Sequence, residues 1–188
     1  IQAIAINEFT KFLKLPAGDG ATQKVRSYLE WLLEVPWGKR TEDTLDIAKA
    51  RAILDEHHSG MERVKERVLE FLAVRKKTGS KKGAIIAFTG PKGTGKTTIA
   101  RSIAKALGRV FVRLSLGGVH DESVLRGHGR TYEGSLPGMI IRQMKLAGVS
   151  NPLFLLDEVD KMGADGKGAV RVRAIEGARL RPVGPEYA

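Results

Sequence analysis

The feature that most constrains this chain is a glycine-rich segment between an apolar run and a helical pattern. Residues 84–88 are apolar and of β-forming character, which predicts a buried strand. Residues 90–97 then satisfy the pattern G-x-x-x-x-G-K-[ST] in full. Apolar residues at helical spacing follow at Ile99, Ile103 and Leu107. A strand, a glycine loop and a helix in this order predict an α/β fold with a loop that binds phosphate groups.

The residue types within this loop each suit a phosphate ligand. Gly93 and Gly95 can adopt backbone angles closed to other residues, so that N–H groups converge on phosphate oxygens. We expect Lys96 to reach the β- and γ-phosphates of ATP and the Thr97 hydroxyl to ligate Mg²⁺. A glycine-rich turn that matches by chance is the alternative, and the flanking strand and helix argue against it. The predicted ATP-binding residues here are Gly90, Pro91, Lys92, Gly93, Thr94, Gly95, Lys96, Thr97 and Thr98.

A second chemical motif lies at the end of a later apolar run. Residues 153–156 are apolar and lead directly into Asp157 and Glu158. At the carboxyl end of a strand, Asp157 can hold Mg²⁺ through water beside Thr97, and Glu158 can polarise the water that attacks the γ-phosphate. A charged strand exit in an ordinary α/β protein is the alternative, and the phosphate loop argues against it. The pair therefore predicts a metal site at Thr97 and Asp157 and a catalytic role for Glu158.

The remaining elements follow from periodicity and from glycine and proline breaks. Apolar stripes predict helices near residues 1–15, 21–35, 46–56, 61–77 and 137–146. Strands are expected near residues 84–89, 110–116 and 152–157. We therefore expect three parts: a helical N-terminal segment over residues 1–78, an incomplete α/β core over residues 79–163, and an unassigned tail over residues 164–188.

Two adjacent histidines within the helical segment invite a metal-binding interpretation. Neighbouring residues do not share a helix face, so His57 and His58 cannot chelate one ion from a helix. We expect a solvated or capping role for both.

Composition excludes some classes of protein and leaves one alternative open. The chain of 188 residues has no cysteine, which excludes disulfides and thiol catalysis and fits a reducing compartment. No apolar stretch approaches the ~18 residues of a membrane span. The net charge of +11 raises the alternative of non-specific DNA binding, but no basic patch interleaved with aromatic residues stands out. The absence of an initiator Met is consistent with a piece of a longer protein.

Beyond these motifs, the chain resembles the Lon family of ATP-dependent AAA+ serine proteases over roughly residues 20–163. The phosphate loop and the Asp-Glu pair are typical of AAA+ and related ATPases in general. The more specific likeness lies in residues 28–37, 60–74, 102–109, 114–119, 126–128, 130–132, 136–138 and 155–162. The resemblance implies a P-loop AAA+ core, here incomplete, preceded by a helical segment.

The resemblance also implies roles that the residues alone do not. Gly60 and Met61 lie where the family packs the adenine, although Ser59 stands in place of the usual aromatic residue. Tyr132 matches a pore-loop aromatic that grips substrate polypeptide in a hexameric ring, and Glu133 replaces a usual apolar residue beside it. The activity implied is ATP-driven protein unfolding and translocation. The partners implied are further copies of the chain in a homo-hexamer and unfolded protein substrates, in the cytoplasm or alternatively the mitochondrial matrix.

The resemblance could not be followed past Gly163. No Ser, Thr or Asn occurs after Asn151, so neither the family's polar sensor residue nor the serine of its Ser–Lys proteolytic dyad is present. The bias of the tail toward Ala, Gly, Arg, Pro and Val suggests an alternative reading frame of GC-rich DNA, which the coding DNA would test. Two further functional hypotheses stay open: a P-loop ATPase that acts on nucleic acid, and an inactive nucleotide-binding fragment.

Overall fold

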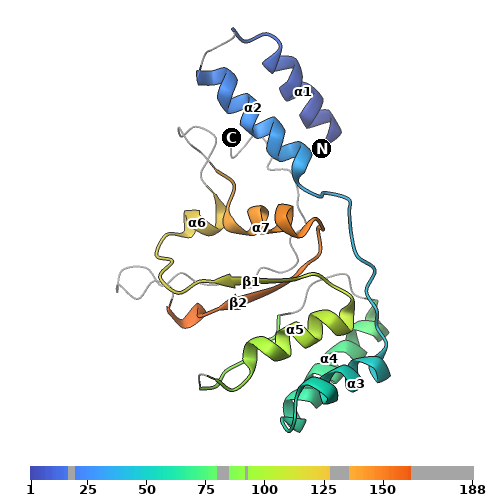
Figure 1. The fold of residues 1–188 in the computed structure, drawn as a ribbon. Coiled ribbons are helices and arrows are strands. Elements are labelled where there is room, and N and C mark those ends of the chain that lie inside the picture. The colour runs from blue at the N-terminus through green and yellow to red at the C-terminus, as the bar shows by residue number, and fades with distance from the viewer. Residues whose placement is uncertain (17–19, 80–84, 92, 128–135, 162–188) are drawn as a thin grey trace. The chain divides into compact units, whose positions relative to one another are not determined.

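The computed structural model describes residues 1–16, 20–79, 85–91, 93–127 and 136–161. In chain order these residues form α1 (Gln2–Phe12), α2 (Gly20–Glu34), α3 (Ile47–His57), α4 (Glu62–Thr78), α5 (Lys96–Leu107), β1 (Phe111–Ser115), α6 (Glu122–Arg126), α7 (Met139–Ala147), β2 (Leu153–Asp157) and the 3₁₀ turn η1 (Val159–Lys161) (Figure 1). Every helix predicted from apolar periodicity is confirmed, and α6 is an additional short helix within a segment that the sequence left without structure.

The described residues divide into two compact units. The first contains Ile1–Lys39 and Asp121–Ser150, and the second contains Arg40–His120 together with the residues from Asn151 onward. Residues of the expected helical N-terminal segment therefore occur in both units. The functional boundary expected near residue 78 stays a prediction.

The second unit is built on two parallel strands. β1 and β2 pair in a register that sets Phe111 opposite Leu153 and Ser115 opposite Asp157. The ladder continues past the strand end, where the Leu116 N–H donates to the Asp157 carbonyl over 2.9 Å. Because parallel strands run in one direction, both carboxyl ends lie at the same edge, and the residues that follow β1 lie beside Glu158.

The strand expected near residues 84–89 is not formed at the described positions 85–89. These residues have strand-forming sequence, and Phe88 packs against the apolar core, yet they belong to no sheet. A strand exists only through hydrogen bonds to a neighbouring strand. Within the described part of the chain β1 and β2 pair with each other, and nothing pairs with residues 85–89. Local propensity alone therefore gave the wrong answer here.

The core of the second unit lies among α3, α4 and α5. Each helix turns an apolar stripe inward, as the spacing in the sequence predicted, and the largest fully buried side chains in this core are Leu54, Val68 and Ile99. Burying a side chain of this size stabilises the folded state by about 1.5–3 kcal/mol. α5, which begins at the phosphate loop, is thereby fixed against two other helices.

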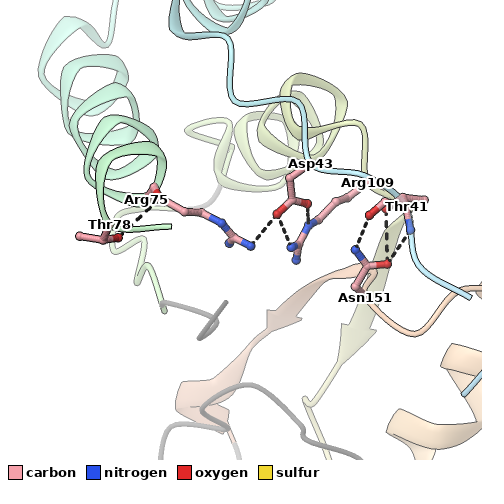
Figure 2. A network of polar contacts seen from close by, with 6 residues as sticks. All are labelled: Thr41, Asp43, Arg75, Thr78, Arg109 and Asn151. Atoms are coloured by element: carbon pink, nitrogen blue, oxygen red, sulfur yellow. Dashed lines mark hydrogen bonds and ion pairs between the residues drawn. The ribbon is translucent and has the colours of Figure 1, made fainter. Parts of the chain in front are cut away.

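A carboxylate with two arginine partners anchors the segment that precedes α3. Asp43 accepts hydrogen bonds from Arg109 Nε over 2.6 Å, Arg109 Nη2 over 2.8 Å and Arg75 Nη2 over 2.7 Å (Figure 2). Burial by itself would raise the pKa of Asp43, but the hydrogen bonds and charges of Arg109 and then Arg75 outweigh it and hold that pKa below its usual value. Asp43 therefore joins the last turn of α4 to the residue that follows the C-cap of α5.

The same segment is tied to the start of β2. The Thr41 N–H donates to Asn151 Oδ1 over 3.0 Å, and Asn151 Nδ2 donates back to the Thr41 carbonyl over 2.9 Å (Figure 2). The Thr44 N–H donates to the Leu107 carbonyl over 3.0 Å, which satisfies a carbonyl at the end of α5. The segment consequently holds α4, α5 and β2 at the ends that lie away from the phosphate loop and the Asp-Glu pair.

The first unit is helical. α1 packs on α2, and in the chain that leaves α2 the Trp37 indole N–H donates to the Leu32 carbonyl over 2.7 Å. α6 packs on α7 through a close backbone approach: any side chain at Gly138 would overlap the Leu125 carbonyl. No helix within the described ranges is long and apolar enough to cross a bilayer.

Replacing Asp43 should destabilise the second unit. In Asp43→Asn the two largely buried guanidinium groups, 11% and 16% exposed, lose their counter-charge, so we expect the free energy of unfolding to fall by about 2–3 kcal/mol. Urea unfolding followed by circular dichroism would measure this. Glu42→Gln, at the exposed neighbouring position, is the matched control, and equal effects of the two variants would contradict the assigned role.

Candidate nucleotide-binding site

The predicted phosphate loop leads directly into a helix N-terminus. Gly95 is the N-cap of α5, with φ 84°, and Gly93 has φ 81°. Both values lie in the left-handed region, which glycine enters without strain. The backbone N–H groups of the loop can therefore converge on the space in front of the α5 N-terminus. The positive end of the helix dipole lies there, and such a position favours phosphate oxygens.

Lys96 lies over this loop. Its ammonium group donates to the carbonyls of Gly90 over 2.7 Å and Pro91 over 2.6 Å. Two hydroxyls brace the same turn: Thr94 donates to the Pro91 carbonyl over 2.9 Å, and Thr98 donates to the Gly95 carbonyl over 2.8 Å. The ammonium group is therefore at the mouth of the loop, and Thr97 follows it as a half-buried residue of α5. Lys92 lies outside the described residues.

The residues expected on the adenine side do lie beside the phosphate loop. Met61, the N-cap of α4, brings its Cε to 3.7 Å from the position that a Cβ on Gly95 would occupy. Gly60 and Met61 both have left-handed backbone, with φ 73° and 59°. Two segments far apart in the sequence are thus adjacent, and their contact with a nucleotide stays a prediction.

The Asp-Glu pair lies at the carboxyl end of β2, as predicted, and is surrounded by basic groups. Asp157 Oδ2 accepts from Arg113 Nη2 over 2.7 Å and from Arg113 Nε over 3.0 Å. Asp157 Oδ1 accepts from the Glu158 N–H over 3.1 Å. The Glu158 carboxylate is paired with Lys161, and this hydrogen bond and charge raise the pKa of Lys161. Both carboxylates therefore have a cationic partner from their own chain.

Glu158 adopts an unusual backbone conformation above a glycine. Its φ of 58° is left-handed, which costs a residue with a Cβ about 1 kcal/mol or more and is found mainly at functional positions. Its carboxylate lies where a side chain on Gly117 would have to be: a Cβ there would overlap Glu158 Oε2. Gly117 thus leaves the space that the carboxylate uses.

Sequence reasoning missed three residues that shape this end of the sheet. Arg113, Lys161 and Gly117 were not singled out, although each contacts or faces the Asp-Glu pair. The parallel register places two of them, Arg113 and Gly117, near the pair. It sets Ser115 opposite Asp157 and so brings the residues on either side of Ser115 to the same edge of the sheet. Side-chain pairing with Arg113 is not visible in the sequence.

Thr97 and Asp157 carry donor atoms of the kind that Mg²⁺ binds, and their joint binding of the ion stays a prediction. Thr97 supplies a hydroxyl and Asp157 a carboxylate, and such oxygen donors are the ligands that Mg²⁺ prefers. Within the described ranges no group of three or more His, Cys, Asp or Glu side chains could form an all-protein metal cage.

The two histidines, both expected to be solvated or capping residues, differ in their burial. His57 is exposed, with Nδ1 2.9 Å from the Ile53 carbonyl oxygen. His58 is the C-cap residue of α3, which agrees with a capping position, but its ring is buried instead of solvated. Its Nε2 lies 2.9 Å from Ser102 Oγ on α5. Burial, followed by the nearby charges of His57 and Lys65, lowers the pKa of His58.

Two predicted features fall outside the described residues. Tyr132, expected in a pore loop, lies in residues 128–135, and the tail beyond Gly163 lies in residues 162–188. Both expectations stay predictions.

Comparison with known proteins gives a family. Residues 86–177 match the model of the ATPase family associated with various cellular activities, AAA, and so extend past Gly163, where the sequence resemblance could no longer be followed. The chain is 52% identical over 168 residues to Lon protease 1 of Bacillus subtilis. This alignment covers 89% of the chain and 22% of that relative. It is 55% identical over 164 residues to Lon protease of Desulfosudis oleivorans, covering 87% of the chain and 20% of the relative.

A third relative, Lon protease of Geobacter metallireducens, is 59% identical over 144 residues, covering 77% of the chain and 18% of the relative. The chain thus spans about a fifth of the length of the curated relatives that it matches.

Gly117→Ala tests the packing of Glu158 directly. The added methyl group must displace the carboxylate or strain the backbone, so we expect a loss of about 1–3 kcal/mol in the free energy of unfolding. In a Glu158→Ala background the obstacle is gone, and the same substitution should cost much less. Gly38→Ala, where no atom lies within 4 Å of the new Cβ, is the control. Equal costs in both backgrounds would show that Glu158 does not occupy this space.

Proposed function

Since this chain belongs to the Lon family as part of its AAA ATPase portion, we propose that it binds ATP with Mg²⁺ and hydrolyses the γ-phosphate. The observation that carries the proposal is the construction of the second unit. One helix, α5, begins at a glycine loop with Lys96 over its mouth, and one strand, β2, ends in an Asp-Glu pair. These are the parts that phosphoryl transfer to water requires.

In this proposal the loop and Lys96 bind the phosphates. The Lys96 ammonium exchanges the Gly90 and Pro91 carbonyls for phosphate oxygens, which are stronger partners because they carry charge. The backbone N–H groups at the start of α5 supply further donors. Gly60 and Met61 form one wall of the part of the nucleotide site that takes the adenine. With Ser59 in place of an aromatic residue, contact with the base rests more heavily on Met61.

Glu158 acts as the base. Thr97 and Asp157 would hold Mg²⁺, which when bound would supply positive charge against the phosphates. Glu158 accepts a proton from the attacking water. For this, the Glu158 carboxylate must either break its ion pair with Lys161 or contact Lys161 and the water at the same time. Arg113 fixes the orientation of the Asp157 carboxylate through two hydrogen bonds.

For the whole protein we propose a wider activity, supported by the likeness to Lon proteases. ATP hydrolysis would drive unfolding and translocation of protein substrates through a homo-hexameric ring, with Tyr132 gripping the polypeptide. The proteolytic Ser–Lys dyad would lie outside this chain. The three named relatives are bacterial, which supports a location in the bacterial cytoplasm over the mitochondrial matrix.

The net charge of +11 favours one other candidate, a P-loop ATPase that acts on DNA. Salt-sensitive DNA binding alone would not distinguish the two candidates, because any basic protein shows it. Stimulation of ATP hydrolysis by DNA would favour the alternative, and stimulation by an unfolded protein would favour the motor of a protease.

Lys96→Ala should weaken ATP binding. The loss of one charged donor to phosphate corresponds to about a 10- to 100-fold rise in the dissociation constant for Mg·ATP, measured by titration calorimetry. Lys49→Ala, at an exposed position on α3, is the control for lost positive charge. Unchanged affinity in Lys96→Ala would contradict the assignment of the phosphate loop.

Glu158→Gln should separate binding from hydrolysis. The amide cannot accept the proton, so we expect hydrolysis to fall by about 10²- to 10⁴-fold with Mg·ATP affinity nearly unchanged. Release of phosphate and titration calorimetry measure the two quantities, and Glu66→Gln on α4 is the control. A variant that loses ATP binding together with hydrolysis would count against Glu158 as the base.

The isolated chain should hydrolyse ATP slowly, because hydrolysis in such rings uses an arginine supplied by a neighbouring subunit. We expect turnover per subunit to rise with protein concentration. Rapid turnover by a dilute monomer would contradict the need for a neighbour's arginine. It would also contradict the hypothesis that the chain is an inactive nucleotide-binding fragment.

A further inference from the structure

We propose that His58 and Ser102 are a positioning pair, which fixes residues 59–61 along α5 and so sets the base side of the nucleotide site. This inference rests on the proposed ATP binding. It concerns residues that the sequence patterns assign to no role in that function.

The pair is a buried contact between two helices. His58 Nε2 lies 2.9 Å from Ser102 Oγ, and the residues are only 6% and 4% exposed. The His58 backbone is fixed as well, because its N–H donates to the Leu54 carbonyl over 3.0 Å at the end of α3. His58 is therefore a fixed point from which the next residues extend.

Those next residues have little conformational preference of their own. Ser59 and Gly60 are exposed, and Gly60 and Met61 both have left-handed backbone. Glycine imposes almost no restriction on the path of the chain. The position of Met61 therefore depends on its own packing against the core and on the anchors at the two ends of the segment, which are His58 on α3 and the first turn of α4.

The second contact of this segment lies further along the same face of α5. Ser102 and Gly95 are seven residues apart, so they share one face of the helix about 10 Å from each other. His58 contacts Ser102, and Met61 lies beside Gly95. The left-handed backbone of Gly60 and Met61 makes this segment shorter than the ~10 Å that three extended residues span, and the Met61 side chain extends its reach to Gly95. Residues 58–61 thus run along α5 from the buried pair to the phosphate loop.

A hydrogen-bonded pair such as His58 and Ser102 fixes the register of α3 on α5 more closely than an apolar contact would. A buried imidazole and hydroxyl are stable only in an arrangement that satisfies both, so they specify one register between α3 and α5. An apolar pair would tolerate sliding. The lowered pKa of His58 means that the ring is neutral at pH 7, and a neutral ring can serve the hydroxyl in either tautomer.

The test compares a ligand with a base and a ligand without one. Titration calorimetry would measure the dissociation constants of Mg·ATP and Mg·tripolyphosphate for the 188-residue chain, for His58→Leu and for Ser102→Ala. We expect both variants to bind Mg·ATP about five- to tenfold more weakly and Mg·tripolyphosphate within about twofold of the parent. A loss of general stability would weaken both ligands alike.

Two further variants sharpen the result. His58→Gln places an amide near the position of Nε2 and should restore most of the ATP affinity. His57→Leu, at the exposed neighbour, should leave both dissociation constants unchanged. Because Ser102→Ala removes a single oxygen atom, it keeps the test valid if His58→Leu does not fold. The double variant should bind ATP no more weakly than either single variant, since the two residues share one contact.

The outcomes separate the two proposals. If the parent chain binds neither ligand, the proposed function fails, and this inference fails with it. If the parent binds Mg·ATP and the variants match it, or lose both ligands equally, the positioning role alone is overturned.

Discussion

The parallel pairing of β1 and β2 is the constraint on which the candidate site depends. Its register brings Ser115 opposite Asp157, so that the chain leaving β1 runs beside the Asp-Glu pair. This has two consequences. Arg113 can reach across to Asp157, and Gly117 lies directly against the Glu158 carboxylate. A slip of one residue in the ladder would reverse the face of every side chain and separate these groups. Five residue pairs of sheet therefore determine where the acidic groups lie.

α5 is the second element that the site needs, and it is held at both ends by different means. At its N-terminus the glycine loop and Lys96 hold the first turn. At its C-terminus Thr44 satisfies the Leu107 carbonyl, and Asp43 ties Arg109 to Arg75 of α4. Between these ends Ile99, Ile103 and Leu107 are buried in the core. Pro91, Gly93 and Thr94 of the loop are exposed, so the position of the loop depends on the buried helix that follows it.

The sequence predicted the parts that depend on local chemistry. Helix α5 and its glycine start follow from residues within one short segment, as does the position of Asp157 and Glu158 at a strand end. What could not be predicted depends on partners distant in the chain. Residues 85–89 have the composition of a strand yet pair with no strand among the described residues. His58 has the sequence of a solvated cap, and its burial follows from the approach of Ser102, 44 residues away. The partners of Asp157 and Glu158 likewise become visible only through the register.

The charges around the Asp-Glu pair explain how two adjacent carboxylates coexist at the end of β2. Neighbouring anions repel each other, and an incoming polyphosphate adds to that repulsion. Arg113 and Lys161 oppose it from within the chain, one for each carboxylate. Their exposures differ from those of the acids: Arg113 is 53% exposed, whereas Asp157 is 23% exposed. A more exposed cation can move aside at little cost in desolvation, since much of its hydration is already in place. Each acid therefore has a counter-charge that can move aside without unpacking the strand beneath it, as the proposed Mg²⁺ site requires.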